Sequence, residues 1–512
     1  MSLPTPAFFR RAARLLRVAA ILPILGVSSH LASLRAAEPD SPESDNTPAE
    51  AESAAKSANA PAVRPGFTPR PIKLPAIPEK FTHPGILNTR AELDFVKGKI
   101  AAGEEPWKSA FEQMKGSFWA ALDYKPNTPR ATIRSGINGS GASDGGVGAA
   151  SMDAKAAYTQ ALMWVFTGNE QYARNAVAIL NAWSILRENL GGNWYLQAAW
   201  LAGTFAEAAE IMRYTWDGWK PDEIARFSEM LEEAFLPIFH NRMAFGNRYF
   251  SVCQAMMAIG VFNNDKAAFA EGLHRWISYV PCWIYLTEDG PEPIRPDFWL
   301  TKPSNDELAA LSPGKKWMFR DQDILALMKT NKLGDDSSLY KLEENFGVGR
   351  RHWNGAPAAA FVDGLSAETF RDLGHCDLGF AALVSCAEIA WHQGIDLYAL
   401  EAKRLTKFLE LHSGLRIDET IPPVFFRVKG TPVQSFVEAG YNHYHNRLGM
   451  ELPKTKAFID KALRPCLTKE INGRSWSWVP VEPGIRAENV VWPTGCNVAW
   501  ETLTHSNTGQ TR

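Results

Sequence analysis

The chain has 512 residues, of which 46% are hydrophobic and 21% charged, and its formal net charge is −2. This composition is typical of a globular protein with a sizeable core, and it excludes a disordered or a membrane-embedded chain. Because the charge is near zero and no long run has one sign, nothing indicates a nucleic-acid or membrane partner. An anionic ligand would need a local basic cleft.

The first 37 residues have the features of a cleaved signal peptide. Four arginines, the last of them Arg17, precede the apolar stretch 18–27, and the small residues at the end of 34–37 suit cleavage. The apolar stretch is too short to span a bilayer comfortably, so we expect a secreted or periplasmic protein. Residues 38–75 are rich in Ala, Pro, Ser and Glu, which predicts a disordered linker.

Residues 76–506 are predicted to form one helical catalytic domain. Apolar residues recur at spacings of three and four along much of this region, as amphipathic helices require. The segments with this pattern are 152–168, 171–186, 196–216, 222–239, 250–262, 266–280, 377–394 and 398–414. Helices of this length with short loops predict an all-α fold, an (α/α) toroid of antiparallel helix pairs around a central cleft. One long insertion falls at 281–345, and minor β elements are expected near 421–433 and 475–492.

Two polar segments stand directly before apolar helical runs. The first, 245–249, contains Asn247, which can cap a helix or face a cleft. The second, 370–377, places Arg371, His375 and two aspartates within seven residues. Such groups beside apolar neighbours favour a functional site, and the alternative is a structural ion-pair cluster.

The densest polar segment is 441–447, with the sequence YNHYHNR. In a helix, Tyr441, Tyr444 and His445 would lie on one face. So many hydrogen-bonding aromatic residues make poor core material, which favours a functional role.

The C-terminal segments 492–496 and 500–505 either close the cleft or only seal the ring, and the second interpretation is favoured. The cysteines are scattered without CxxC pairs, so we expect neither a zinc site nor a need for disulfides. They are Cys253, Cys282, Cys376, Cys386, Cys466 and Cys496. No metal and no cofactor are predicted.

Several of these segments carry a resemblance to a known family. They are HPGILNTRAELDFVKGKIAAGEEPW, AAWLAGTFAEAAEIMRYT, ETFRDLGHCDLG and YNHYHNRLGMELP, in this order. Together they resemble the bacterial alginate lyase superfamily over roughly 80–506, and are nearer to polysaccharide lyase family thirty-eight than to family five. The resemblance implies an (α/α) toroid that cleaves β-1,4-linked uronate polymers by β-elimination without a metal.

The residue types present suit that reaction. The C5 proton of a uronate is weakly acidic, so the enzyme must neutralise the carboxylate and stabilise an enolate-like intermediate. Asn247, His375 and Arg371 have the donors for this work.

In related lyases one tyrosine serves as both base and acid, which requires cations to lower its pKa from about 10. Family five places this tyrosine about two helical turns after the neutralising arginine, but 371–380 contains no tyrosine here. We therefore expect Tyr441 to be the base, with Tyr444 as the second choice. The cations expected to lower its pKa are Arg371, His375, His443 and Arg447. The predicted substrate-binding residues are Tyr444, His443, Arg447, Trp194 and Trp200.

Three alternatives stay open. The polymer is either alginate of the mannuronate type or β-1,4-glucuronan, because both present the same leaving group and C5 proton. A helical toroid also suits a glycoside hydrolase with two facing carboxylates. Its candidates are Asp363, Asp372, Asp377, Glu207 and Glu501. A polysaccharide-binding protein without activity would fit the 18 tryptophans, but it leaves 441–447 unexplained.

Overall fold

The computed structural model describes the chain from residue 72 to residue 509 with gaps. The described residues are 72–135, 146–191, 194–240, 246–291, 293–294, 303–320, 353–417, 422–425, 428, 437–468, 478–480, 489–491 and 500–509. The chain divides into two units, Met1–Glu50 and Ala51–Arg512, and every described residue belongs to the second. The predicted signal peptide, and the predicted linker up to residue 71, lie outside the described residues.

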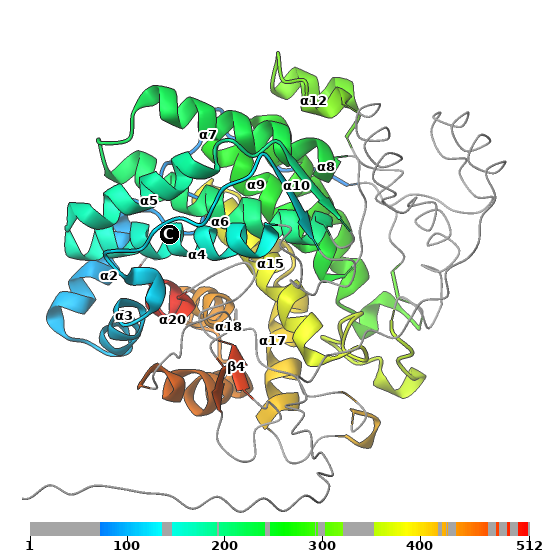
Figure 1. Cartoon of the computed structure of the whole chain (residues 1–512). Coiled ribbons are helices and arrows are strands. Elements are labelled where there is room, and N and C mark those ends of the chain that lie inside the picture. The colour runs from blue at the N-terminus through cyan, green and yellow to red at the C-terminus, as the bar shows by residue number, and fades with distance from the viewer. Residues whose placement is uncertain are drawn as a thin grey trace, which may run out of the picture. The chain divides into compact units, whose positions relative to one another are not determined.

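The predicted all-α class is confirmed, because 68% of the structure is helix and 3% is strand (Figure 1). The longer helices are α2 (Arg90–Ala102), α3 (Trp107–Lys115), α4 (Val147–Thr167), α5 (Glu170–Trp183), α6 (Trp194–Thr215), α7 (Pro221–Ala234), α9 (Asn247–Phe262), α10 (Lys266–Trp283), α15 (Leu373–His392) and α17 (Ala402–Ile417). The shorter ones are α8 (Leu236–His240), α12 (Asn305–Leu311), α16 (Leu397–Leu400), α18 (Val437–Tyr441), α19 (Pro453–Phe458) and α20 (Glu501–His505).

Polar caps and glycines fix where these helices begin and end. Thr89 and Glu92 form a capping box at the start of α2, and the Asn169 side chain caps α5. The Asp372 side chain accepts a hydrogen bond from a backbone N–H at the start of α15. Helix α4 ends at Gly168, whose left-handed φ of 70° a residue with a Cβ rarely adopts. The helix boundaries thus lie close to those predicted from the sequence.

Helix α9 is the centre of the packing, and all its residues except Arg248 are buried. It packs against α6, α10 and α15, while α4 packs against α5 and α6. Two glycines bring α9 and α10 close together. A Cβ at Gly260 would lie 2.7 Å from the Phe269 nitrogen, and one at Gly272 would lie 2.8 Å from the Cys253 carbonyl oxygen. Residues with larger side chains at these two positions would force α9 and α10 apart.

The two ends of the described helical series meet. Helix α20 contacts α2 and α3, as closure of a ring requires. Its residues are buried, which agrees with the sealing interpretation of 500–505, whereas 492–496 lies outside the described residues.

Two small sheets accompany the helices. Strands β3 (Trp478–Pro480) and β4 (Asn489–Val491) pair antiparallel within the predicted 475–492 region. Strands β1 (Thr132–Ser135) and β2 (Glu188–Gly191) pair in parallel and were not predicted, because each is only four residues long. In the 421–433 region the described part contains a 3-10 turn, Pro423–Phe425, in place of a strand.

Helix α15 is long and apolar enough to cross a membrane, with a mean hydropathy of 1.3. However, 94% of that apolar stretch is buried inside the protein, so the helix is a core element. It leads directly from the polar segment around His375 into the core.

Candidate functional site

The site lies where the start of α9 meets the turn that precedes α15. Glu368, on this turn, is buried and accepts two hydrogen bonds from Asn247, one from the backbone N–H (2.7 Å) and one from Nδ2 (2.9 Å). Arg371 Nη1 lies 3.6 Å from Glu368 Oε1. One buried carboxylate therefore joins Asn247 to Arg371.

Gly246 makes this close approach possible. It has a φ of 62°, and a Cβ built on it would lie 2.6 Å from the Glu368 carboxyl carbon. Its backbone N–H donates to the Tyr279 hydroxyl oxygen at 2.7 Å. Any residue with a side chain would be strained here and would displace Glu368.

His375 stands at the first turn of α15, with 31% of its side chain exposed. Its Nδ1 lies 2.6 Å from Asp372 Oδ2, which fixes the ring orientation. Burial raises the pKa of Asp372, but the hydrogen bonds and charge of His375, together with Arg371, lower it below its ordinary value. An ionised aspartate holding Nδ1–H leaves Nε2 as the basic nitrogen of the ring.

Three of the four predicted catalytic residues thus belong to one connected group. Glu368 links Asn247 to Arg371, and Asp372 and His375 follow on the same turn. The sequence analysis missed Glu368, which lies three residues before Arg371. That spacing, which puts the two side chains on one side of a helical turn, was the available signal. Tyr279, also missed, sits within an apolar helix and gave no signal.

Trp200 is connected to the same group. Its Nε1 donates to Ser251 Oγ (3.1 Å), and Ser251 Oγ donates to the Asn247 carbonyl (2.9 Å). The Trp200 side chain is partly exposed, and its role in substrate binding stays a prediction. Trp194 begins α6, and its side chain lies outside the described residues.

The predicted residues of the 441–447 segment are buried, which does not favour the roles predicted for them. Residues Asn442–Arg447 form a π-helix. Tyr444 is fully buried and donates to the Tyr398 carbonyl at 2.9 Å, and the buried His443 ring stacks on the Tyr398 ring at 3.8 Å. Because these side chains face the interior, a polymer on the surface would not contact them.

Arg447, the third predicted binding residue in this segment, is also internal. Its guanidinium lies 3.1 Å from Glu92 and 3.1 Å from Glu388, and 2% of its side chain is exposed. The segment therefore joins α2 to α15 as a buried ion cluster.

Tyr441 does not have the environment expected of a base. It is 6% exposed and stacks on His445 with ring centroids 4.7 Å apart. Burial, followed by the charges of Asp460 and Glu451, raises its pKa above the ordinary value. The prediction required cations to lower this pKa, so this environment does not favour Tyr441 as the base.

One group of described residues has the geometry of a metal site. The ligand atoms of Glu92, Glu388 and His392 lie within 4.8 Å of one another, all buried. The Arg447 guanidinium already balances both carboxylates, and a cation there would be repelled by it. This arrangement suits an internal ion cluster better than a metal centre. The five described cysteines are free thiols, and Cys496 lies outside the described residues.

The carboxylates proposed for a hydrolase serve other tasks. Asp377 pairs with Arg416, and Glu501 accepts a hydrogen bond from the Ala439 backbone. Glu207 is fully buried, which raises its pKa well above the ordinary value. Asp363 accepts from Thr287, and Asp372 holds His375. These engagements do not favour an acid pair for hydrolysis.

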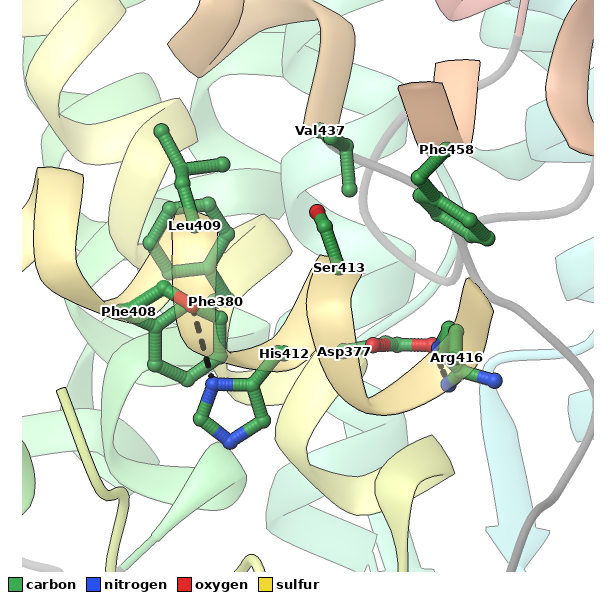
Figure 2. Close-up of a pocket in the computed structure, with 9 residues that line it drawn as sticks. All are labelled: Asp377, Phe380, Phe408, Leu409, His412, Ser413, Arg416, Val437 and Phe458. Atoms are coloured by element: carbon green, nitrogen blue, oxygen red, sulfur yellow. Dashed lines mark hydrogen bonds and ion pairs between the residues drawn. The ribbon is translucent and has the colours of Figure 1, made fainter. Parts of the chain in front are cut away.

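A small pocket lies between α15, α17, α18 and α19 (Figure 2). In Figure 2 Asp377 meets Arg416 on one side, and His412 bonds to the Phe408 carbonyl on the other. The other ring nitrogen of His412 lies 3.0 Å from Thr369 Oγ1. Since Thr369 follows Glu368, this buried histidine supports the turn that carries the site.

One family model matches part of the chain. The family model described as alginate lyase matches residues 105–281, which confirms the resemblance to the alginate lyase superfamily. That range includes Asn247 but not the turn with Glu368. No curated protein matches the chain.

Solved structures of one alginate lyase are similar to the chain. Alginate lyase A1-III from Sphingomonas species A1 is 14% identical, over 82% of this chain and 97% of that one, with a TM-score of 0.45. A histidine-to-alanine variant of alginate lyase A1-III complexed with tetrasaccharide is 14% identical over 61% and 73% of the two chains, with a TM-score of 0.37. The tyrosine-to-phenylalanine variant, also with tetrasaccharide, is 16% identical over 62% and 75%, with a TM-score of 0.35.

Proposed function

Because residues 105–281 match the alginate lyase family, we propose that the chain is a polysaccharide lyase that cleaves β-1,4-linked uronate polymers by β-elimination. The polymer is alginate rich in mannuronate, or β-1,4-glucuronan cut by the same mechanism. The observation that carries the proposal is the partly exposed His375, oriented by Asp372 and next to the cation Arg371.

In this mechanism Arg371 binds the uronate carboxylate, which makes the C5 proton more acidic. His375 Nε2 takes that proton, because Asp372 holds Nδ1 and stabilises the imidazolium that forms. The electrons of the C5–H bond form the C4=C5 double bond as the C4–O4 bond breaks. The imidazolium then returns the proton to O4, so one side chain is both base and acid on one face of the sugar.

His375 replaces Tyr441 as the proposed base. Burial and then nearby acidic groups raise the pKa of Tyr441, whereas His375 is partly exposed and is oriented by Asp372. The chemistry needs no metal, because a guanidinium next to the carboxylate supplies the positive charge. We therefore expect full activity after treatment with a chelator.

The test is an assay of the purified chain on polymannuronate, polyguluronate and glucuronan. An unsaturated product absorbs in the ultraviolet through its conjugated double bond, whereas hydrolysis or simple binding produces no such absorbance. We expect one or more of the three polymers to give this product. If all three stay intact while a neutral glycan is cut, the proposed function is wrong.

We also propose that the protein is exported after cleavage of residues 1–37. The basic start, the apolar stretch 18–27 and the small residues of 34–37 support this. Sequencing the N-terminus of the protein recovered from outside the cytoplasm tests it. A mature chain that still begins at residue 1 would contradict export by this signal.

A further inference from the structure

Two buried histidines hold the segment that leads into α2. Its consecutive residues Ile86 and Leu87 each meet one imidazole through the backbone carbonyl. The Nδ1 atom of His392, at the end of α15, lies 3.1 Å from the Ile86 carbonyl oxygen. The Nε2 atom of His505, at the end of α20, lies 3.0 Å from the Leu87 carbonyl oxygen. These contacts join the start of the described helical series to α15 and α20, where the ring closes.

The geometry of His392 indicates that its ring is charged. A carbonyl oxygen only accepts hydrogen bonds, so Nδ1 must carry a hydrogen to bond Ile86. The other ring nitrogen, Nε2, lies 3.0 Å from Glu92 Oε2 and 3.6 Å from Glu388 Oε2. A neutral ring with its hydrogen on Nδ1 would turn the lone pair of Nε2 toward these carboxylate oxygens, which repel it. A hydrogen on both nitrogens removes this repulsion and makes the ring an imidazolium.

The charges around His392 balance only when its ring carries this second hydrogen. Glu92 and Glu388 are buried, and burial raises the pKa of both carboxyls. The positive charges of His392 and Arg447 nevertheless lower both pKa values below the ordinary one. Two carboxylates thus face one guanidinium and one imidazolium. Loss of the imidazolium proton would leave one negative charge in the interior without a partner, which is strongly destabilising.

Titratable groups from each packed element face His392 or its two carboxylate partners. They are Glu92 of α2, Glu388 of α15, Tyr398 of α16, His443 and Arg447 of the π-helix, and His505 of α20. Tyr398 donates to Glu388 at 2.7 Å, and burial raises its pKa, so it stays neutral. His443 Nδ1 accepts from Arg447 Nη1 at 3.3 Å. Burial lowers the pKa of His505, so this ring is neutral in the pH range where His392 is charged.

The direction of the pH dependence follows from the two carboxylates. Burial lowers the pKa of His392, but Glu92, followed by Glu388, raises it above the ordinary value of 6.5. A histidine of this kind adds stability to the folded chain below the pKa of the unfolded chain, about 6.5. That stability is lost as the pH rises through the pKa of the folded chain.

We propose that His392 is a pH-sensitive switch in the ring closure: its imidazolium joins segment 86–92 to α15, and its deprotonation loosens this segment at alkaline pH. The inference concerns the closure of the fold and does not depend on the proposed function. His505 holds the neighbouring carbonyl of Leu87 without a charge, so this second contact does not respond to alkaline pH.

A titration of the natural protein is the first test. In the full chain labelled with ¹³C-histidine, the nuclear magnetic resonance signal that disappears in His392→Gln belongs to His392. We expect the midpoint of its titration to lie above pH 6.5. A midpoint at or below pH 6.5 would show that the ring is not held as an imidazolium, and the proposal would be wrong.

Melting temperatures between about pH 6 and about pH 9 test the effect on stability. His392→Gln should melt on the order of 5 °C below the natural protein at pH 6, and this difference should shrink as the pH rises. His505→Gln is the matched control, because its deficit should be the same at every pH above about 6.5. A deficit of His392→Gln that does not change with pH would overturn the proposal.

Hydrogen exchange in the natural protein locates the change and needs no variant. After correction for the intrinsic effect of pH, amides in 86–92 should exchange up to about tenfold faster for each pH unit above the midpoint. Amides in 250–262, within α9, should keep their corrected rates. Equal acceleration in both segments would mean that the whole fold loosens, which contradicts a switch at the ring closure.

Discussion

Two polar clusters that look alike in the sequence have opposite placements in the fold. The 368–375 turn leaves His375 and Arg371 partly exposed, whereas Arg447 in the 441–447 segment is closed in by Glu92 and Glu388. The density of polar residues did not distinguish them. What differs is where their partners come from, because the second cluster is covered by residues more than fifty positions away along the chain.

This difference indicates which cluster suits catalysis and which suits a structural role. A group that must exchange a proton with substrate needs solvent access and one fixed ring nitrogen, as His375 has. A buried ion cluster joins elements distant in sequence, and here it joins α2, α15 and the π-helix. Mutations in the two clusters should therefore affect different measurements.

The largest expected effect is on catalysis, from His375→Ala. Loss of the proposed base should lower kcat by about 10²- to 10⁴-fold, with little change in melting temperature, since the ring is partly exposed. Initial rates of unsaturated product formation measure it. If the variant keeps a rate close to that of the natural protein, His375 is not the base, and the 368–375 turn is not distinguished from the 441–447 segment by a catalytic role.

The Arg447→Met substitution should lower the stability of the protein and leave its catalytic rate unchanged. Removing the guanidinium leaves Glu92 and Glu388 buried without their partner, which should lower the free energy of unfolding by about 3–5 kcal/mol. Denaturant titration measures the change. The matched control is Arg174→Met, which breaks an exposed ion pair with Glu170 and should cost at most about 0.5 kcal/mol.

The catalytic rate of the folded Arg447→Met variant tests separately whether this cluster takes part in catalysis. Rates per folded molecule should match the natural protein if the cluster is only structural. If the fully folded variant is less active than the natural protein, the 441–447 segment contributes to the active site.

His412 contacts Thr369 in the turn before α15, and its burial should make the stability of the protein depend on pH. Burial lowers its pKa to about 3, below the ordinary 6.5. Between these values the unfolded chain binds a proton that the folded chain does not, so the free energy of unfolding falls as the pH falls. The slope from this group is about 1.4 kcal/mol per pH unit at most.

Comparing the natural protein with His412→Gln isolates this contribution, because other groups titrate in both. We expect the variant to have the flatter dependence between about pH 6.5 and about pH 4. Equal slopes for the two proteins would mean that His412 is protonated in the folded state.

The smallest expected effect comes from Tyr441→Phe. Since burial and acidic neighbours raise its pKa, removal of the hydroxyl should change kcat by less than about tenfold. The same rate assay decides it. A loss as large as that of His375→Ala would restore the tyrosine as base and place both clusters in one site.

Much of the architecture was predictable from the sequence. The helical repeats set the helices to within a few residues, and Asp372 and Asn169 marked two of their starts. The signal was strong because apolar periodicity and caps are local properties. The four-residue strands β1 and β2 were missed, since such short segments carry little periodicity.

The site was only partly predictable. Asn247, Arg371 and His375 were predicted because polar residues before apolar helices are unusual, and the structure brings them into one connected group. Glu368 was missed, although it organises the site, because its importance lies in a contact with a residue 121 positions away. The burial and the acidic neighbours of Tyr441, which do not favour it as the base, are not visible along the chain.

The sequence by itself determined the helical class, the helix boundaries and the residue types available for uronate chemistry, because each depends on neighbours within a turn or two. The tertiary structure decided which polar cluster is open and which is closed. Exposure, the pairing of charges and the contact of Asn247 with Glu368 depend on segments that meet only when the chain folds. Those contacts moved the proposed proton transfer from Tyr441 to His375.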